Sequence, residues 1–184
     1  MLGKGPGINL FKAVEKEIGK KNIIAEDLGF ITDSVKKLLK DCDYSGIKVL
    51  EFAFDERDTG VCSEYLPHNY PYNCVAYTGT HDNQTLFSWF KDLSEKEKSN
   101  VRKYLCDFYT PDEKMHKSLL CSLMRSNANI CIIPLQDVLG LSDNSRINIP
   151  GTIENNWEWR VKKEQLSKET IKFLSEITAL YDRT

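Results

Sequence analysis

Two short apolar runs in this sequence are each followed by acidic side chains. Residues 23–25 lead directly into Glu26, and residues 75–77 are separated by three residues from the pair His81 and Asp82. Burying an unpaired carboxylate costs roughly several kcal/mol, so an acid at the end of an apolar strand faces water, is paired, or is kept for proton transfer with a raised pKa. One such strand leaves these possibilities open. Two strands that end in the same way favour one shared site, with Glu26 and Asp82 as its carboxylates.

The elements that must position these acids alternate between strands and helices. Hydrophobic periodicity predicts short strands at residues 23–26, 47–54, 74–77 and 130–134. The same analysis predicts helices at residues 9–19, 33–41, 84–90, 95–107, 112–126 and 167–181. Thr32 and Ser94 are the expected N-caps of the helices that follow them. Residues 55–73 show no clean period and are expected to form a long ordered loop.

Units of strand, helix and strand are parallel and right-handed, because the crossover helix must pack back on its own sheet. The carboxyl ends of parallel strands meet at one edge, where such folds place their sites. A small doubly wound sheet is the alternative, but its glycine-rich loop would follow a strand, and Gly3, Gly5 and Gly7 follow none. Four parallel strands are half of an eight-stranded barrel. We therefore expect an α/β fold in which residues 1–184 form one half-barrel domain.

Composition limits the classes of function. The chain has 184 residues, of which 41% are hydrophobic and 28% charged, which is typical of a globular domain. Its formal net charge of -2 argues against nucleic acid or an anionic membrane as a partner. No apolar stretch reaches the ~18 residues of a membrane span, and residues 1–7 lack the apolar core of a signal peptide. We expect a cytoplasmic location.

The six cysteines are scattered, without a Cys-x-x-Cys pair or a histidine at ligand spacing. We expect them to be mostly reduced and buried rather than joined in a disulfide framework. No cofactor is expected from any motif in the sequence.

Six motifs, in order along the chain, resemble the carboxyl-terminal part of the 4-α-glucanotransferases (amylomaltases or disproportionating enzymes), the family 77 glycoside hydrolases. Each motif alone could arise by chance, whereas six in one order at the family's spacing make the resemblance specific. They lie at residues 24–29 (IAEDLG), 46–54 (GIKVLEFAF), 66–70 (LPHNY), 77–83 (YTGTHDN), 134–141 (PLQDVLGL) and 146–160, which includes NIPG and NWEWR.

The resemblance implies a retaining transglycosylase of the α-amylase superfamily, built on a (β/α)8 barrel and acting on maltooligosaccharides and other α-1,4-glucans. Glu26 falls on the general acid/base of the family, and Asp82 on the carboxylate that stabilises the positively charged transition state. His81 falls on a hydrogen-bond donor beside Asp82. Phe52 and Asn148 are the further substrate-binding residues that it suggests. The resemblance implies no metal.

One element of the family pattern is missing. The nucleophile lies in an Arg-x-Asp-His run on an earlier strand, and this sequence contains no such run. We therefore expect residues 1–184 to be a carboxyl-terminal fragment with strands five to eight, lacking the amino-terminal half of the barrel. Such a fragment should be inactive alone, and should self-associate or pair with the missing half. Glu51 stands where family members often carry glutamine.

Two other classes of function remain open. A metal-dependent hydrolase could use Glu26, Asp27, His81 and Asp82 as ligands, although the second histidine usual in such sites is absent from this stretch. A non-catalytic carbohydrate-binding module or scaffold would use the aromatic residues without the acids.

Several other residues have a simpler structural explanation. Asp27 is expected to form a structural salt bridge, and His68 to brace its loop. Trp157 and Trp159 are expected to pack against the last helix, and His116 to lie at the surface.

Overall fold

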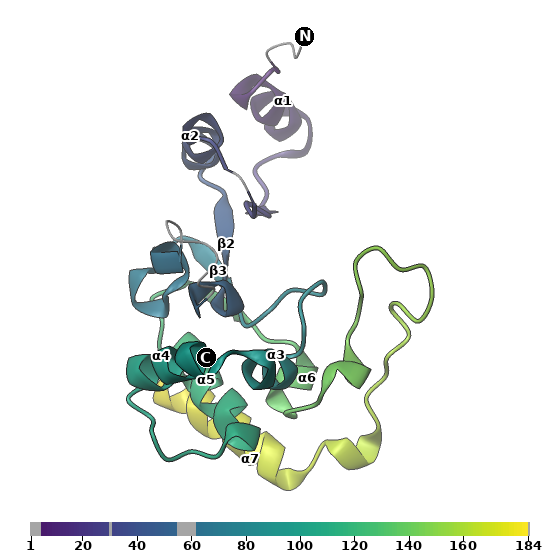
Figure 1. Ribbon diagram of the computed structural model, residues 1–184. Helices are drawn as coiled ribbons and strands as arrows, with labels where there is room; N and C mark the ends of the chain where they lie inside the picture. The colour runs from purple at the N-terminus through teal and green to yellow at the C-terminus, as the bar shows by residue number, and fades with distance from the viewer. Residues whose placement is uncertain (1–4, 30, 55–61, 184) are drawn as a thin grey trace.

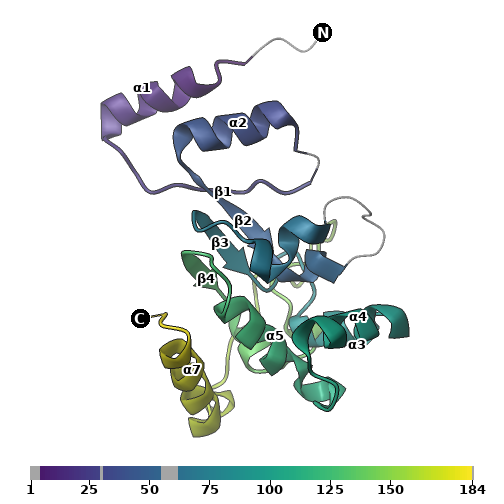
Figure 2. The ribbon, with the colours of Figure 1, turned by 90° about the vertical axis from the view of Figure 1, so that its left-hand side faces the viewer.

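A sheet of four parallel strands forms the centre of the protein. The computed structural model describes residues 5–29, 31–54 and 62–183, and within them the strand order is β1-β2-β3-β4 (Figure 2). The strands are β1 (Ile24–Ala25), β2 (Ser45–Val49), β3 (Cys74–Tyr77) and β4 (Ile130–Ile132). Ile24 pairs with Ser45, Ile47 with Val75, and Val75 in turn with Ile130. The expected parallel α/β arrangement is confirmed.

The helices form two groups, one near each outer strand of this sheet. Helices α1 and α2 lie beyond β1, whereas α3, α4, α5 and α7 lie toward the β4 side (Figures 1 and 2). The helices are α1 (Ile8–Ile18), α2 (Asp33–Cys42), α3 (Leu86–Asp92), α4 (Glu95–Leu105), α5 (Met115–Met124), the short α6 (Leu135–Val138) and α7 (Lys168–Leu180). Short 3-10 turns connect several of them. No helix within the described ranges is long and apolar enough to cross a bilayer.

Local sequence explains where these helices begin. Ser94 and Glu97 form a reciprocal capping box at α4: the Ser94 hydroxyl accepts from the Glu97 amide, and the Glu97 carboxylate accepts from the Ser94 amide. Thr32 precedes α2 in extended geometry as expected, but its hydroxyl contacts Ser34 instead of a backbone amide. Ser94 is therefore a full cap, and Thr32 only marks the boundary.

The predicted strand at residues 47–54 is too long. Strand β2 ends at Val49, and residues Leu50–Phe54 form a 3-10 turn. Leu50, Ala53 and Phe54 are all buried, and their spacing of three and four residues suits a helical turn that points them into one core. This turn carries Glu51 and Phe52.

The main hydrophobic core lies between the sheet and helices α3, α4 and α5. Its fully buried members include Leu50, Leu86, Phe90, Leu119 and Leu123. The connection from β3 to β4 supplies most of these side chains. The carboxyl ends of β2, β3 and β4 are therefore held against a rigid layer, which is what a site at this edge requires.

The end of the chain is fastened to the end of α5. The Arg183 guanidinium donates to the backbone carbonyls of Met124 (2.9 Å), Ser126 (2.6 Å) and Ala128. The last carbonyls of a helix have no partner within the helix, and a planar guanidinium can satisfy several at once. This clamp places the end of α7 beside the loop that enters β4.

The cysteines agree in part with expectation. Cys42 and Cys74 are buried, Cys121 and Cys131 are partly buried, and Cys106 is exposed. All of these five are free thiols. The side chain of Cys62 lies outside the described residues.

The expectation that His116 lies at the surface is wrong. Its side chain is only 7% exposed, because α5 is surrounded by other elements along most of its length. It packs against Gly140, which has φ +63°, and a Cβ added at Gly140 would lie 2.6 Å from His116 Cε1. Burial, followed by the nearby Lys117, lowers the pKa of His116 to about 4.

Protonation of His116 should destabilise the fold. Its pKa of about 4 in the folded chain lies below the ordinary 6.5, so the unfolded chain binds the proton first. Stability is then complete above the ordinary pKa and falls as the pH drops from 6.5 toward 4. Urea denaturation should show that His116→Gln removes part of this loss, on the order of 2 kcal/mol.

Wild type and His116→Gln must be compared because titration of Asp137 changes the stability of the fold in the opposite direction over this pH range. Burial raises the Asp137 pKa from 3.8 to about 6, so its contribution to stability is lost as the pH rises through that window. His116→Gln leaves the Asp137 contribution in place. The difference in unfolding free energy between wild type and His116→Gln therefore reports the titration of the His116 imidazole. Identical pH profiles for the two proteins would contradict the prediction.

Candidate active site

The chemistry-bearing side chains follow the carboxyl ends of the strands. Glu26 follows β1, Phe52 lies in the turn after β2, and His81 and Asp82 follow β3. Asn148 comes from the chain beyond β4. Because the strands are parallel, these ends lie along one edge of the sheet, as expected.

A tight turn presents His81 and Asp82 at this edge. The Asn83 side-chain oxygen accepts hydrogen bonds from the Thr80 amide (2.9 Å) and hydroxyl (2.7 Å). The Asp82 amide in turn donates to the Thr80 hydroxyl at 3.3 Å. Residues 80–83 are thereby closed on themselves, with the exposed side chains of His81 and Asp82 pointing outward. We refer to residues 80–83 as the Asp82 turn.

Asp82 is a half-exposed carboxylate with one oxygen already engaged. Its side chain is 49% exposed, and Oδ1 accepts from the Asn148 amide at 2.6 Å and lies 3.4 Å from His81 Nε2. Arg146 Nη2 donates to the Asp82 backbone carbonyl at 2.8 Å. Oδ2 has no partner among the described residues and can accept a ligand hydroxyl. Asn148, which we expected to bind substrate, contacts Asp82 in this structure.

The segment that supplies Arg146 and Asn148 reaches back over the turn. The Trp157 amide donates to the Ile147 carbonyl at 2.7 Å, which closes the segment into a loop. The Trp157 ring centroid is 5.1 Å from that of His81, and the residue is 58% exposed at φ +65°. Trp157 therefore lies beside the candidate site, and not in the packed tail that the sequence suggested.

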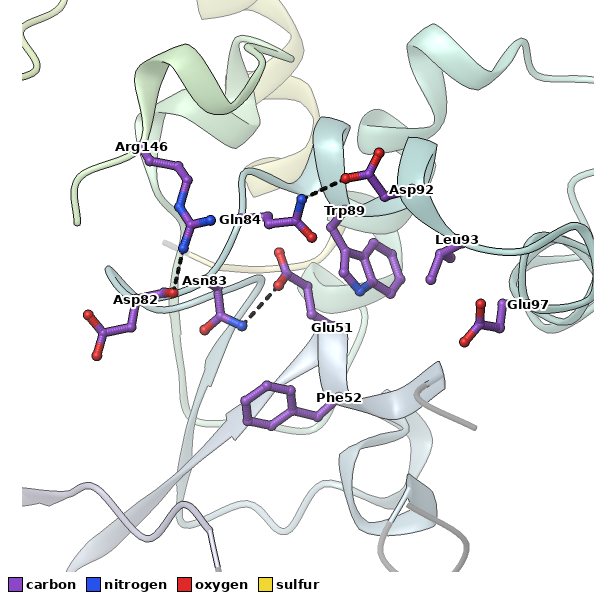
Figure 3. A pocket seen from close by; sticks show the side chains of 10 residues that line it. All are labelled: Glu51, Phe52, Asp82, Asn83, Gln84, Trp89, Asp92, Leu93, Glu97 and Arg146. Carbon is purple, nitrogen blue, oxygen red and sulfur yellow. Dashed lines mark hydrogen bonds between the residues drawn. The ribbon is translucent and has the colours of Figure 1, made fainter. Parts of the chain in front are cut away.

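A first cavity of about 510 Å³ opens beside the Asp82 turn (Figure 3). Phe52, Trp89 and Leu93 supply apolar surface, and polar side chains supply the rest of the wall. The polar lining residues are Glu51, Asp82, Asn83, Gln84, Asp92, Glu97 and Arg146. Aromatic faces among hydrogen-bonding groups are the usual surroundings of a small polar ligand. Phe52 is held edge-on against Tyr65, with the ring centroids 5.4 Å apart.

A second cavity of about 470 Å³ contains the other predicted acid. Glu26 and His81 line it together with Tyr77 and a set of isoleucines from the strands, including Ile24, Ile47 and Ile132. Burial, and then the charge of Glu26, raises the pKa of Tyr77. Glu26 and Asp82 therefore line two cavities that meet at the Asp82 turn, where we expected a single shared site.

Asp27 has a structural role. Its Oδ1 accepts a hydrogen bond from the Ile47 amide at 2.7 Å, which fastens the end of β1 to β2. A Cβ at Gly46 would lie 2.6 Å from Asp27 Oδ2, so glycine is required beside it. Asp27 is therefore a structural residue, as expected. Its partner is the Ile47 backbone amide, where we expected the cation of a salt bridge.

Two further expectations concern His68 and a possible metal site. His68 braces its loop as expected, because its ring nitrogen Nδ1 lies 3.1 Å from the Tyr104 hydroxyl. Among the described residues, no group of three or more histidine, cysteine, aspartate or glutamate side chains could hold a metal ion. The metal-dependent hydrolase therefore has no ligand cluster in this part of the chain.

Two carboxyl groups are buried beneath the site. The Asp137 carboxylate accepts from the Thr78 hydroxyl (2.5 Å) and the Leu86 amide (2.7 Å), and burial raises its pKa to about 6. Glu51 is also buried, and desolvation followed by the charge of Asp137 raises its pKa well above the ordinary value. The sequence marked Glu51 only as a departure from the family's usual glutamine and suggested no role for Arg146. No spacing rule could have found Arg146, because its contact with Asp82 spans 64 residues.

Comparison with known proteins gives a consistent set of similarities. Residues 2–167 match the family described as 4-alpha-glucanotransferase. The chain is 45% identical over 183 residues to the chloroplastic/amyloplastic 4-alpha-glucanotransferase of Solanum tuberosum, covering 97% of this chain and 31% of that protein. It is 38% identical over 184 residues to the 4-alpha-glucanotransferase of Streptococcus pneumoniae, covering 98% of this chain and 35% of the relative.

Nearly all of this chain resembles part of a solved structure, the amylomaltase from Streptococcus agalactiae in complex with acarbose. The TM-score is 0.89 at 34% identity, covering 98% of this chain and 36% of that one. The chain thus spans about a third of the length of the curated relatives that it matches.

The Asn148 contact should matter for the docking of residues 146–157. Asn148→Asp replaces a 2.6 Å hydrogen bond to Asp82 by two facing carboxylates, which should cost about 1–2 kcal/mol of unfolding free energy in urea. Asn144→Asp adds the same charge at an exposed position nearby and is the matched control. Equal stability of the two variants would show that the Asn148 contact does not hold the loop.

Proposed function

We propose, from the premise that this chain belongs to the 4-alpha-glucanotransferase family, that it supplies two of the three catalytic carboxylates of a retaining transglycosylase. Its substrates are maltooligosaccharides and other α-1,4-glucans. Glu26 is the general acid/base and Asp82 the carboxylate that stabilises the transition state. His81, Phe52 and Asn148 belong to the substrate-binding surroundings.

The proposed chemistry follows from where the two carboxyl groups lie. Glu26 is exposed at the end of β1, so it can protonate the glycosidic oxygen as the C–O bond breaks and later accept a proton from the acceptor hydroxyl. The covalent step needs a nucleophilic carboxylate. The family's Arg-x-Asp-His run does not occur in residues 1–184, so that carboxylate must come from outside this chain.

One observation carries most of the proposal for Asp82. Asn148 and Arg146 fix the carboxylate and its backbone, while Oδ2 stays open toward solvent. A preoriented carboxylate can hold a sugar hydroxyl and favour positive charge developing on the ring without reorganising during the reaction. Phe52 and Trp89 offer aromatic faces in the adjoining cavity, on which a sugar ring can stack.

The proposal includes the architecture. The four strands form strands five to eight of a (β/α)8 barrel, and the similarity to an amylomaltase at a TM-score of 0.89 supports this assignment. In such a barrel the second cavity faces the interior. We expect no cofactor, metal, nucleic acid or membrane in the reaction. The cytoplasmic location stays a prediction, because the Solanum tuberosum relative is named as chloroplastic/amyloplastic.

A non-catalytic carbohydrate-binding or scaffold role is the second candidate. It is favoured by the missing Arg-x-Asp-His run and by the coverage of only about a third of the relatives. Such a protein would bind α-glucans through Phe52 and Trp89 without turnover. Activity in a completed barrel separates the two candidates.

A chimera tests the catalytic proposal. Residues 1–184 replace the matching third of the Streptococcus agalactiae amylomaltase, and maltotriose disproportionation is followed by glucose release. We expect the chain alone to be inactive and the chimera active. Glu26→Gln in the chimera should lower turnover by ~10²-fold or more, because the amide keeps the shape and cannot transfer the proton.

The matched control in the chimera is Glu154→Gln, which removes an exposed carboxylate near the tip of the 146–157 loop. This variant should leave turnover unchanged. Near-normal glucose release by a folded Glu26→Gln chimera would overturn the assignment of the acid/base. Turnover by residues 1–184 alone would overturn the proposed need for an external nucleophile.

Association of the chain tests the half-barrel. The edge strands β1 and β4 expose Ile24, Ile130 and Ile132, and Ile24 and Ile132 also line the second cavity. Unpaired edges beside an apolar face favour pairing with another chain. Light scattering at tens of micromolar should therefore show oligomers, or a complex with the complementary part of a relative.

Charge substitutions make this test specific. Ile132→Lys should reduce association, because lysine on an edge strand opposes pairing. Ile153→Lys changes a residue that is 97% exposed at the loop tip, and it should leave association unaltered. A monodisperse wild-type monomer would show that the fold covers its own edges.

A further inference from the structure

The buried Glu51 lies directly beneath the Asp82 turn. Its backbone amide donates to the Thr78 carbonyl at 3.2 Å, and its Oε2 accepts from the Asn83 side-chain amide at 3.0 Å (Figure 3). The residue is only 4% exposed. A Cβ at Gly79 would lie 2.9 Å from Glu51 Oε1, so the side chain fills the space that this glycine leaves. Glu51 therefore contacts both the backbone just before the turn and Asn83 at its end.

Asn83 connects Glu51 to the backbone that carries Asp82. One end of its amide donates to Glu51, and the other accepts from the amide and hydroxyl of Thr80. An amide with two anchored ends has a single orientation, whereas an amide held only from the turn can rotate or swing outward. Glu51 thus determines the orientation of the group that closes the turn.

We propose that Glu51 is a positioning residue that holds Asp82 in place through Asn83 and Thr80, and that it does so as a neutral carboxylic acid. The proposal rests on the role proposed above for Asp82. Glu51 contacts no reacting atom itself. It acts by fixing the turn from which His81 and Asp82 project.

The charges around Glu51 explain why the neutral form suits this position. Asp137 of α6 and Asp143 of the following 3-10 turn oppose a negative charge, whereas Asn83 and Arg146 favour one. Burial is the largest influence, and the net effect raises the pKa of Glu51 well above its usual range. Ionisation at high pH would place a second negative charge beside Asp137, in a space with almost no access to water. The side chain would then be driven from beneath the turn.

Hydrogen exchange of backbone amides tests this inference without substrate, so its outcome is independent of whether the chain is a transglycosylase. The reporter is the Thr80 amide, whose acceptor is the Asn83 side chain. Glu51→Ala should accelerate its exchange by about tenfold, because Asn83 loses its anchor. Glu51→Gln, which keeps shape and neutrality, should stay within about twofold of the wild type. Asp92→Asn removes another carboxylate from the same cavity and should have no effect.

The pH dependence separates positioning from simple packing. As the pH rises through the Glu51 pKa, Thr80 in the wild type should lose protection relative to Glu51→Gln. Intrinsic exchange accelerates equally in both proteins, so their ratio isolates the titration. The amides of β3 should behave alike in both proteins. This comparison stays decisive if Glu51→Ala fails to fold. An unchanged Thr80 amide in folded Glu51→Ala, or identical pH profiles for wild type and Glu51→Gln, would overturn the inference.

Discussion

The arrangement of the candidate site depends on the buried carboxylate of Asp137. It lies on α6, just after β4, and accepts from the Thr78 hydroxyl at the end of β3 and from the Leu86 amide at the start of α3. Thr78 and Leu86 bracket the whole connection that carries His81, Asp82 and Asn83. One side chain thus fixes both ends of that connection relative to β4, and the loop between them has little freedom. The two hydrogen bonds also offset the cost of burying the group.

A second buried acid so close to Asp137 requires the two groups to differ. Asp137 has two donors, which favour its ionised form, and its pKa rises only to about 6. Glu51 has one donor, from Asn83, and desolvation dominates. One carboxylate and one neutral acid can share this space at neutral pH, whereas two charges could not. The pair resembles the general pattern in which two carboxyl groups are pushed apart in pKa by their surroundings. Here the two acids hold the loop between β3 and α3 in place, and neither has to take part in the chemistry.

Sequence reasoning placed the elements better than it placed their contacts. The parallel strands followed from hydrophobic periodicity, and the strand-end positions of Glu26 and Asp82 followed from the strands themselves. The 3-10 turn after Val49 was missed because a continuous apolar run fits either a strand or a helical turn. His116 was misplaced because its burial depends on Gly140, which packs against it from another element. The contacts of Asn148 and Trp157 depend on a loop that folds back across many residues, and no local pattern encodes them.

The same long-range contacts decide how robust the site is. Asp82 receives Arg146 and Asn148 from 64 and 66 residues further along the chain, and Glu51 supports its turn from 32 residues earlier, through Asn83. The contacts of Arg146 and Asn148 need β3 and the loop beyond β4 in place, and the contact of Glu51 needs β2 and β3. Glu26, by contrast, projects from β1 at the edge of the sheet, where Asp27 anchors the strand end to β2 by a side-chain hydrogen bond. The two candidate carboxylates therefore differ in how they are held. The position of Asp82 is determined by contacts within residues 45–157, whereas Glu26 lies on an edge strand that is held by its pairing with β2 and by Asp27.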